Sequence, residues 1–378
     1  MAKLTVIIGA GFSAPAGLPL ARDINERFNR DQRKMLLQMS SSEWFWKDYK
    51  DETFIHNGSI PRDTNYYSYI LDELVKKYIS ENLVFNDYEH FFEYLNTNCT
   101  DKKWLENVYA VAKKNFLDDH PHLKTKEAQE YLFFLEDQPF VSKLIGVINF
   151  LISDLLTVAV TPGIFDSYYI FFTDYLKQFD EVTIFTLNHD LLLERILEYH
   201  GIEYSRGFSK NDSPIYYEGN PLPVFNNDFG NVKVKIYKLH GSLDYFRFNN
   251  IDNFNYTNKY NYFITSGYRE KHFATRVNLE TKEVIQDFNA DIIPKFITGK
   301  NKPAIIKNDT MFSALFEHFE TEVATAENLL VSGYSYSDEH INEALEKRNN
   351  LSVVNNNRSK DYPFSCSTVR NIKSLGEL

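Results

Sequence analysis

The sequence predicts an α/β fold built on a doubly wound parallel sheet, and three observations predict it. An apolar run over residues 3–8 has the character of a buried strand, and a glycine-rich turn and a helical pattern follow it. Further apolar runs, each followed by polar residues, alternate with helical patterns in the second half of the chain. The length of 378 residues suits one large α/β domain with an insertion. Together these features indicate a Rossmann-like sheet.

The first half of the chain contributes one strand and many helices. After the strand over residues 3–8, a helix is expected over residues 20–29. Residues 31–161 have a helical pattern rich in large aromatics, without strand–helix alternation, and are therefore expected to form an insertion. A helix over residues 165–178 then leads into a strand over residues 182–187, a short apolar run typical of a parallel sheet.

The second half supplies the remaining strands. Strands are predicted over residues 232–239, 329–331 and 353–355, the last of these ending the sheet, and helices over residues 312–326 and 338–348. Residues 245–290 are crowded with Asn, Tyr and Phe and are expected to form loops and short hairpins.

These elements predict a discontinuous domain organisation. Residues 1–30 and 165–355 are expected to form the Rossmann-like domain, with residues 31–164 inserted as a helical lobe and residues 356–378 as a polar, loosely ordered tail. Because the lobe carries more aromatic side chains than one small core needs, we expect it to cover the ligand cleft and to supply part of a subunit interface.

Composition excludes several classes of protein. The formal net charge of -11 argues against a long surface that follows nucleic-acid phosphates, so strong direct binding of nucleic acid is not expected. Two cysteines cannot build a cysteine-rich zinc module or a disulfide framework, and a reduced, cytoplasmic setting is therefore expected. The apolar stretch over residues 144–160 is interrupted by Asn149 and Asp154, which favours a buried helix over a membrane span.

The first glycine-rich turn carries a nucleotide-binding pattern. Gly9, Gly11 and Ala14 fit the dinucleotide fingerprint GxGxxG/A directly after an apolar strand. Glycines at these positions permit a tight turn and a close approach of the backbone to a pyrophosphate at a helix N-terminus. The alternative is a turn that only joins a strand to a helix.

Three further strand ends carry polar residues. Asn188 and Asp190 follow the strand over residues 182–187, and they could bind an amide or a ribose, or could cap the next helix. His240 ends the following strand and could hydrogen-bond a sugar hydroxyl, or could be a structural histidine. Residues 333–338 offer glycine and hydroxyl groups suited to phosphate or ribose, or a helix cap at Ser337 or Asp338. Because ligands bind beyond the carboxyl ends of the strands in doubly wound sheets, we expect these four turns to share one site.

The sequences of these turns, and their order along the chain, resemble the sequence motifs of the sirtuins. Residues 9–19, GAGFSAPAGLP, resemble the GAGxSxxxGxP signature, and residues 186–190, TLNHD, are similar to the TQNxD motif. Residues 238–243, KLHGSL, resemble the sirtuin histidine-glycine motif. Residues 333–342, GYSYSDEHIN, resemble the GYSxxDxxIN segment of bacterial sirtuin-like defence NADases. These motifs span nearly the whole chain in the family order.

The resemblance implies roles for individual residues. It makes Asn188 and His240 catalytic, with NAD as the substrate and no metal in the site. Cofactor-binding roles fall to Gly9, Ala10, Gly11, Ser13, Arg22, Asp190, Gly333 and Ser335. Three departures from the deacetylases accompany this likeness. Residues 20–22 read LAR where those enzymes carry DFR, so only Arg22 matches, and Leu187 replaces the customary Gln. In addition, no four-cysteine module follows His240. Peptide deacylation depends on that module, so the resemblance points away from it.

The function that these features predict is NAD glycohydrolysis. The resemblance implies an effector of antiphage defence that depletes NAD, restrained by homo-oligomerisation or by a partner such as a HerA-type ATPase. The alternatives are a non-catalytic sensor of NAD or ADP-ribose, and a zinc-free deacylase or ADP-ribosyltransferase. An oxidoreductase would leave three of the four motifs without a purpose.

Overall fold

The protein is described from a computed structural model. The structure describes residues 2–29, 36–40, 43–46, 66–82, 88–98, 100–126, 140–252, 255–265, 267–285, 290–291, 293–299 and 302–378. The chain folds as two compact units, each described below by itself. Unit 1 comprises Met1–Leu18, Val158–Ile297 and Asn301–Leu378, and unit 2 comprises Pro19–Thr157 and Thr298–Lys300.

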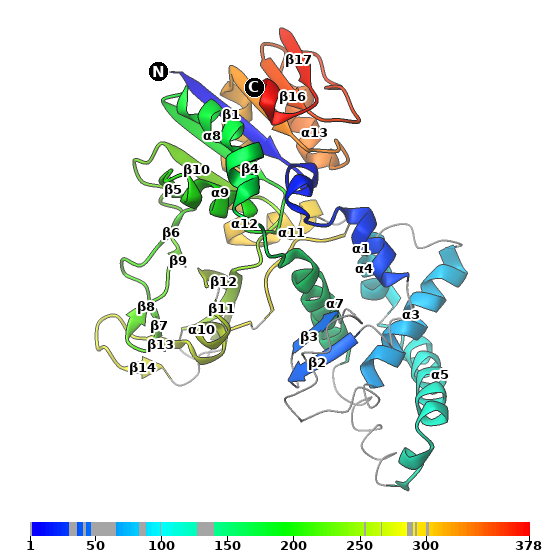
Figure 1. The fold of residues 1–378 in the computed structure, drawn as a ribbon. Helices are drawn as coiled ribbons and strands as arrows, with labels where there is room; N and C mark the ends of the chain where they lie inside the picture. The colour runs from blue at the N-terminus through cyan, green and yellow to red at the C-terminus, as the bar shows by residue number, and fades with distance from the viewer. Residues whose placement is uncertain are drawn as a thin grey trace. The chain divides into compact units, whose positions relative to one another are not determined.

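Unit 1 is built on a seven-stranded parallel sheet in the order β17-β16-β15-β1-β4-β10-β5 (Figure 1). Its strands are β1 (Lys3–Ile8), β4 (Glu181–Thr186), β5 (Tyr204–Ser205), β10 (Val234–Lys238), β15 (Asn328–Ser332), β16 (Ser352–Asn356) and β17 (Thr368–Ile372). The chain moves from β1 outward through β4 and then crosses back to β15 on the other side of β1. This reversal is the topological switch point of a doubly wound sheet, so the predicted fold class is confirmed.

Helices cover both faces of this sheet because its strands are apolar on both sides. On one face Val6 and Ile8 pack in a core with α8 (Ile170–Lys177) and α9 (Leu192–Tyr199). A π-helical turn, Phe165–Tyr169, precedes α8 and joins the same core. On the other face Ile7 packs with α11 (Lys302–Asn308), α12 (Thr310–Thr325) and α13 (Glu339–Glu346). Successive residues of β1 thus supply two separate cores.

Two segments of the chain, one between β5 and β10 and one between β10 and α11, together form a largely antiparallel region. The strands β11 (Tyr245–Asp252) and β12 (Asn255–Ile264) form a long hairpin, where the sequence suggested only loops and short hairpins. The smaller elements are β6 (Phe208–Ser209), β7 (Ile215–Tyr217), β8 (Asn220–Pro221), β9 (Val224–Phe225), α10 (Tyr268–Phe273), β13 (Thr275–Val277) and β14 (Val284–Ile285). Phe246, Phe248 and Phe263 of the long hairpin form a small core of their own with β7.

The C-terminal segment extends the sheet beyond the strand that was expected to be last. Strand β17 pairs in parallel with β16 over its whole length, and the final turn, Leu375–Glu377, buries Leu375 against the α8 face. The expectation of a loosely ordered tail was wrong for these residues. Four of the five β17 side chains are exposed, and an edge strand of this kind carries no apolar pattern to predict it from.

Unit 2 is mainly helical in the residues that the structure describes. Its helices are α1 (Ala21–Phe28), α3 (Tyr66–Asn82), α4 (Tyr88–Asn98), α5 (Lys102–Asp119) and α7 (Phe140–Leu156). An antiparallel pair, β2 (Leu36–Ser40) and β3 (Glu43–Trp46), lies in a segment that was expected to be helical throughout. Within the described residues, no helix combines the length and the apolarity that a membrane span requires.

Candidate functional site

Four strands of the main sheet end in the same row. Ile8 of β1 is in register with Thr186 of β4 and with Ser332 of β15, and Thr186 is in register with Lys238 of β10. The four polar turns predicted from the sequence begin directly after this row. Asn188 and His240 each stand two residues beyond it, on neighbouring strands. The fold therefore brings the four turns to one edge of the sheet, at its switch point.

Backbone contacts join the first and last of these turns. The Gly9 N–H donates to Ser332 O at 3.0 Å, and the Gly11 N–H donates to Gly333 O at 2.9 Å. A Cβ atom on Gly333 would lie 2.0 Å from Phe12 N, and Gly333 has a φ of +66°. Glycine is therefore required where the two turns cross. The close crossing of these two backbones therefore explains part of the glycine-rich pattern in the sequence.

Ser13, Asn188 and Asp190 form a buried polar cluster. The Asn188 Nδ2 group donates to Gly9 O at 3.1 Å and to Ser13 Oγ at 3.0 Å, and Ser13 Oγ donates to Asp190 Oδ2 at 3.0 Å. Both N–H groups of the Asn188 amide thus bind the glycine-rich turn. In the described part of the chain no hydrogen bond reaches its Oδ1 atom, which can accept one from a ligand hydroxyl or a water.

Asp190 also has a structural role. Its Oδ1 atom accepts a hydrogen bond from Leu192 N at 2.9 Å, at the start of α9. The N-cap residue of α9 is Leu191, so Asp190 binds the first helical N–H from the position before the cap, whereas Asn188 is engaged with the glycine-rich turn. Burial raises the pKa of the Asp190 carboxyl above its usual value.

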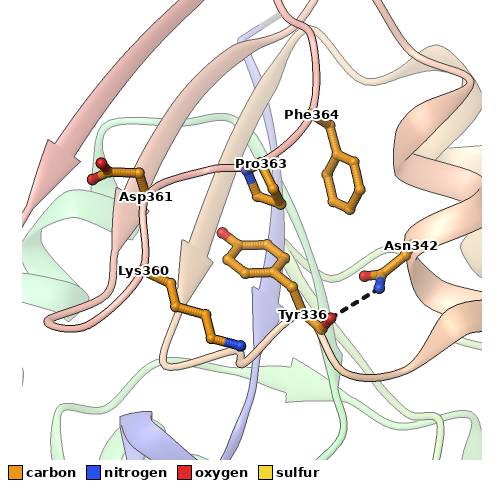
Figure 2. A pocket seen from close by; sticks show the side chains of 6 residues that line it. All are labelled: Tyr336, Asn342, Lys360, Asp361, Pro363 and Phe364. Carbon is orange, nitrogen blue, oxygen red and sulfur yellow. Dashed lines mark hydrogen bonds between the residues drawn. The ribbon is translucent and has the colours of Figure 1, made fainter.

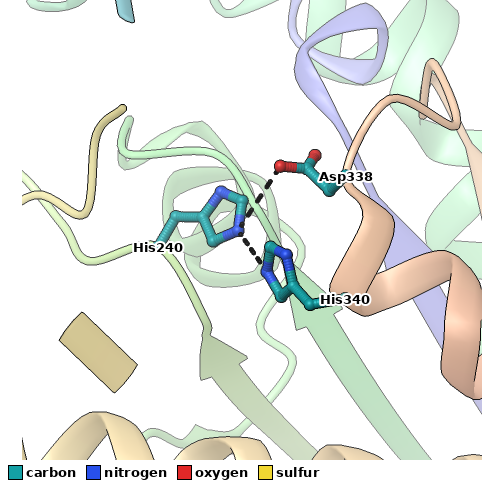
Figure 3. Close-up of side chains that lie close together, drawn as sticks. All are labelled: His240, Asp338 and His340. Carbon is teal, nitrogen blue, oxygen red and sulfur yellow. Dashed lines mark hydrogen bonds and ion pairs between the residues drawn. The ribbon is translucent and has the colours of Figure 1, made fainter. Parts of the chain in front are cut away.

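His240 lies at the centre of a second cluster, with side chains from the loop before α13 and from that helix (Figure 3). Its Nε2 atom lies 3.3 Å from His340 Nε2 and 3.9 Å from Asp338 Oδ1. The ammonium group of Lys302 forms an ion pair of 2.8 Å with Asp338 Oδ1. Although Asp338 occupies the N-cap position of α13, its side chain makes no capping hydrogen bond and faces Lys302 and His240 instead.

The surroundings of this cluster disfavour the charged form of both histidines. Burial, reinforced by the positive charge of Lys302, lowers the pKa of His240 well below its usual value. Burial also lowers the pKa of His340, in spite of the nearby Asp338 carboxylate. A neutral imidazole has one nitrogen that accepts a proton or a hydrogen bond. His240 can therefore accept from a ligand hydroxyl, as the sequence suggested.

A network of buried charges lies under the Asn188 and His240 turns. Lys238, which is 0% exposed, donates to Asp190 O and to Glu194 Oε1, the latter at 3.2 Å. Arg206 forms a bidentate pair with Asp244, with distances of 2.7 and 2.8 Å. The first pair ties β10 to α9, and the second ties the segment after β5 to the segment after His240, so together they hold the ends of these strands in place.

A pocket of about 470 Å³ lies beyond the carboxyl ends of β15 and β16 (Figure 2). Its lining residues are Tyr336, Asn342, Lys360, Asp361, Pro363 and Phe364. The Asn342 side chain donates to Tyr336 O at 3.0 Å, which holds the turn before α13 on that helix. The Tyr336 and Phe364 rings lie 5.9 Å apart and nearly perpendicular. Sequence reasoning missed this pocket because its two sides come from segments that only β16 brings together.

The remaining predicted residues fall into two places. Ala10, Gly11 and Ser335 are exposed at the edge of the strand-end region. Ser335 Oγ donates to Ser337 Oγ at 2.9 Å, and Lys360 Nζ donates to Ser335 O at 2.6 Å. Arg22 is exposed on α1, which belongs to unit 2. The structure thus gathers nine of the ten predicted residues in unit 1.

A comparison with protein families matches the second half of the chain. Residues 182–362 match the family model of the SIR2-like domain. The match begins in β4 and ends just short of Phe364, so it includes His240 and the turn at Gly333. No curated protein matched the chain. The family match supports a sirtuin-like protein, and SIR2-like domains are in general NAD-dependent enzymes that use NAD as a substrate. It therefore indicates an NAD-related activity for this chain.

Proposed function

We propose that the chain is an NAD glycohydrolase, which cleaves NAD to nicotinamide and ADP-ribose. The observation that carries the proposal is the position of Asn188 and His240. Both residues follow neighbouring strands at the same register, beside the switch point of a doubly wound sheet. Each offers an acceptor atom and no charge, which suits hydroxyl groups of a ribose or a water molecule.

The pocket at Tyr336 and Phe364 fits the adenine end of NAD. Aromatic rings supply stacking faces for a purine, and Asn342 and Lys360 supply polar groups at the rim. In this arrangement the exposed turns at Ala10 and Ser335 bind the phosphates of NAD. The acceptor atoms of Asn188 and His240 bind the nicotinamide ribose. This order places the bond to be broken at the carboxyl ends of β4 and β10.

The reaction breaks the bond between the nicotinamide nitrogen and C1 of the ribose. The electron pair of that bond leaves with nicotinamide, and positive charge develops on the ribose. His240 Nε2 can accept a hydrogen bond from a ribose hydroxyl and so increase the electron density of the sugar as this charge forms. Asn188 Oδ1 can orient the water that adds to C1, and the released proton passes to solvent.

The product distribution tests the proposal. We expect the purified full-length chain, assayed alone and with the proteins of neighbouring genes, to convert NAD to nicotinamide and ADP-ribose. No acetylated peptide is needed, because water is the acceptor. Chromatography measures the two products, nicotinamide and ADP-ribose. NAD consumption that depends strictly on an acetylated peptide, or tight NAD binding without nicotinamide release under any of these conditions, would contradict the proposal.

Replacement of Phe364 by alanine is expected to weaken substrate binding and to spare the chemical step. Loss of one stacking ring typically costs about 1–3 kcal/mol of binding free energy. The KM for NAD should therefore rise roughly 5- to 150-fold while kcat stays near the native value. Steady-state kinetics measure the split, and Phe273→Ala, which changes an exposed ring on α10, serves as the matched control. A fall in kcat with an unchanged KM would contradict the assignment of this pocket to adenine.

We also propose that the activity serves antiphage defence in the cytoplasm, by depleting NAD. The support is the likeness of residues 333–342 to the GYSxxDxxIN segment of defence NADases. Such an activity harms the cell that carries it, so it needs restraint. Homo-oligomerisation, with residues 31–164 contributing to the interface, or a HerA-type ATPase partner would provide it.

Sedimentation tests the proposed assembly. We expect the chain to sediment as an oligomer, at a size that depends on protein concentration or on NAD. Deletion of residues 31–164 is unsuitable, because the break could unfold the chain, so the native protein is compared over a range of concentrations. A monomer under all of these conditions would argue against the interface.

A further inference from the structure

The cluster around His240 has the geometry of a metal site. His240, Asp338 and His340 each offer one ligand atom, and these three atoms lie within 4.8 Å of one another. Two of them, the Nε2 atoms of His240 and His340, are 3.3 Å apart. Figure 3 shows both rings directing these nitrogens toward each other, with the Asp338 carboxylate at their side. The three ligand atoms come from two separate segments, the turn after β10 and the start of α13.

The distances suit a tetrahedral ion. With zinc–nitrogen bonds of about 2.0–2.1 Å, two imidazole nitrogens of a tetrahedral site are separated by roughly 3.3 Å. The observed separation of the two Nε2 atoms equals this value. The Asp338 oxygen lies 3.9 Å from His240 Nε2, so a small rotation of the carboxylate would bring it to the same separation. Two histidines and one carboxylate are a common zinc ligand set that leaves a fourth position open.

The surroundings of the cluster support the same conclusion. Asp338 makes no capping bond to α13, so its carboxylate is directed into the cluster. Lys302 binds Asp338 Oδ1 at 2.8 Å, but a carboxylate has about four lone-pair sites. Lys302 can therefore stay bound and orient the carboxylate, as outer-shell partners of metal ligands do.

We infer that His240, His340 and Asp338 form a regulatory Zn²⁺ site whose occupation inhibits NAD cleavage. This inference rests on the proposed function, because it gives His240 two roles: it binds the ribose hydroxyl when NAD is bound, and it binds zinc when the ion is present. A neutral imidazole has a single acceptor nitrogen, and zinc at Nε2 takes the lone pair that the ribose hydroxyl needs. Substrate cleavage and zinc binding then exclude each other at one atom.

Calorimetric titration with ZnCl₂ tests the site without reference to activity. The full chain, first treated with a chelator, is expected to bind Zn²⁺, and His340→Gln should lower the affinity by at least about 100-fold, since even outer-shell changes cost 10- to 100-fold. His318→Gln, which removes another imidazole on α12, should bind Zn²⁺ as the native chain does. Titration with CoCl₂ should give the visible absorption of a tetrahedral complex in the native chain and in His318→Gln, but not in His340→Gln. Equal Zn²⁺ affinity in the native chain and His340→Gln, or no binding by the native chain, would overturn the site.

Nicotinamide release measured with and without ZnCl₂ tests the regulation. Inhibition should appear in the native chain, reverse on addition of a chelator, and require correspondingly more Zn²⁺ in His340→Gln, with thermal melting used to show that the variant is folded. Zinc binding at this site without inhibition of an active enzyme would overturn the regulatory claim. If no preparation releases nicotinamide, the proposed function fails, while calorimetry still decides whether the zinc site exists.

Discussion

Replacement of His240 by alanine is expected to lower the rate of nicotinamide release by about 100-fold or more. The change removes the Nε2 acceptor that we assign to a ribose hydroxyl, an interaction that strengthens as charge develops in the transition state. The loss should fall on kcat and on kcat/KM alike. Nicotinamide release at saturating NAD measures it, and calorimetry with NAD measures binding separately.

Stability measurements separate this result from a structural effect. His240 is 4% exposed, so its loss leaves a small void, but its hydrogen-bonding contact is another side chain, His340, and no backbone group loses a partner. The variant should therefore melt close to the native temperature. His318→Ala on α12 is the matched control and should release nicotinamide at the native rate. Near-native turnover per folded molecule of His240→Ala would contradict the catalytic role that we assign to His240.

Asn188 needs a different substitution because its amide also holds the glycine-rich turn. Asn188→Ala would lose the bonds to Gly9 O and Ser13 Oγ, and so would reduce rate and stability together. Asn188→Ser keeps a shorter hydroxyl group that can still bond to the turn, and it removes the Oδ1 acceptor. A rate that falls far more than the melting temperature in this variant would assign Oδ1 a role in the reaction.

Replacement of Arg206 by methionine is expected to lower the free energy of unfolding by about 3–5 kcal/mol. The guanidinium forms the bidentate pair with Asp244, lies 3.5 Å from Glu194, and is 7% exposed. Although burial alone would raise the pKa of Asp244, Arg206 holds it below the usual value, which shows that the carboxylate depends on this partner. Methionine replaces the aliphatic stem of arginine but supplies no positive charge to the two buried carboxylates.

Urea denaturation of the native chain and two further variants measures this effect. Lys177→Met breaks an ion pair of 2.8 Å between exposed side chains, and a pair of that kind contributes less than about 1 kcal/mol. The double variant Arg206→Met with Asp244→Leu should recover part of the loss, because it removes a stranded charge. A loss for Arg206→Met as small as that for Lys177→Met would show that the buried network does not hold the two strand ends.

The apolar pattern of the sequence was sufficient for the fold class. Buried strands such as β1, β4 and β15 are short, continuous apolar runs, because side chains on both faces enter a core. The pattern failed at β17, where four exposed side chains leave only backbone pairing to define the strand. It also failed for the hairpin of β11 and β12, whose polar side chains resemble those of loops.

The sequence also predicted which strand ends carry polar turns, since each turn directly follows its strand. It could not predict the contacts between the turns. Ser13 and Asn188 are 175 residues apart, and His240 and His340 are 100 residues apart, and both pairs meet only because the parallel strands end in one row. The Tyr336 and Phe364 pocket escaped prediction for the same reason.

The sequence by itself determined the doubly wound parallel sheet and the residue types at its carboxyl edge, because these depend on local apolar runs and on the glycines and polar residues that follow them. Tertiary structure alone decided how those residues are used. The Gly11 N–H donates to Gly333 O, and the Asn188 amide donates to the glycine-rich turn. The Asp338 side chain lies beside Lys302 and His240 and does not cap its helix. Each of these choices depends on distances between segments far apart in the chain, which long-range packing fixes and local pattern does not.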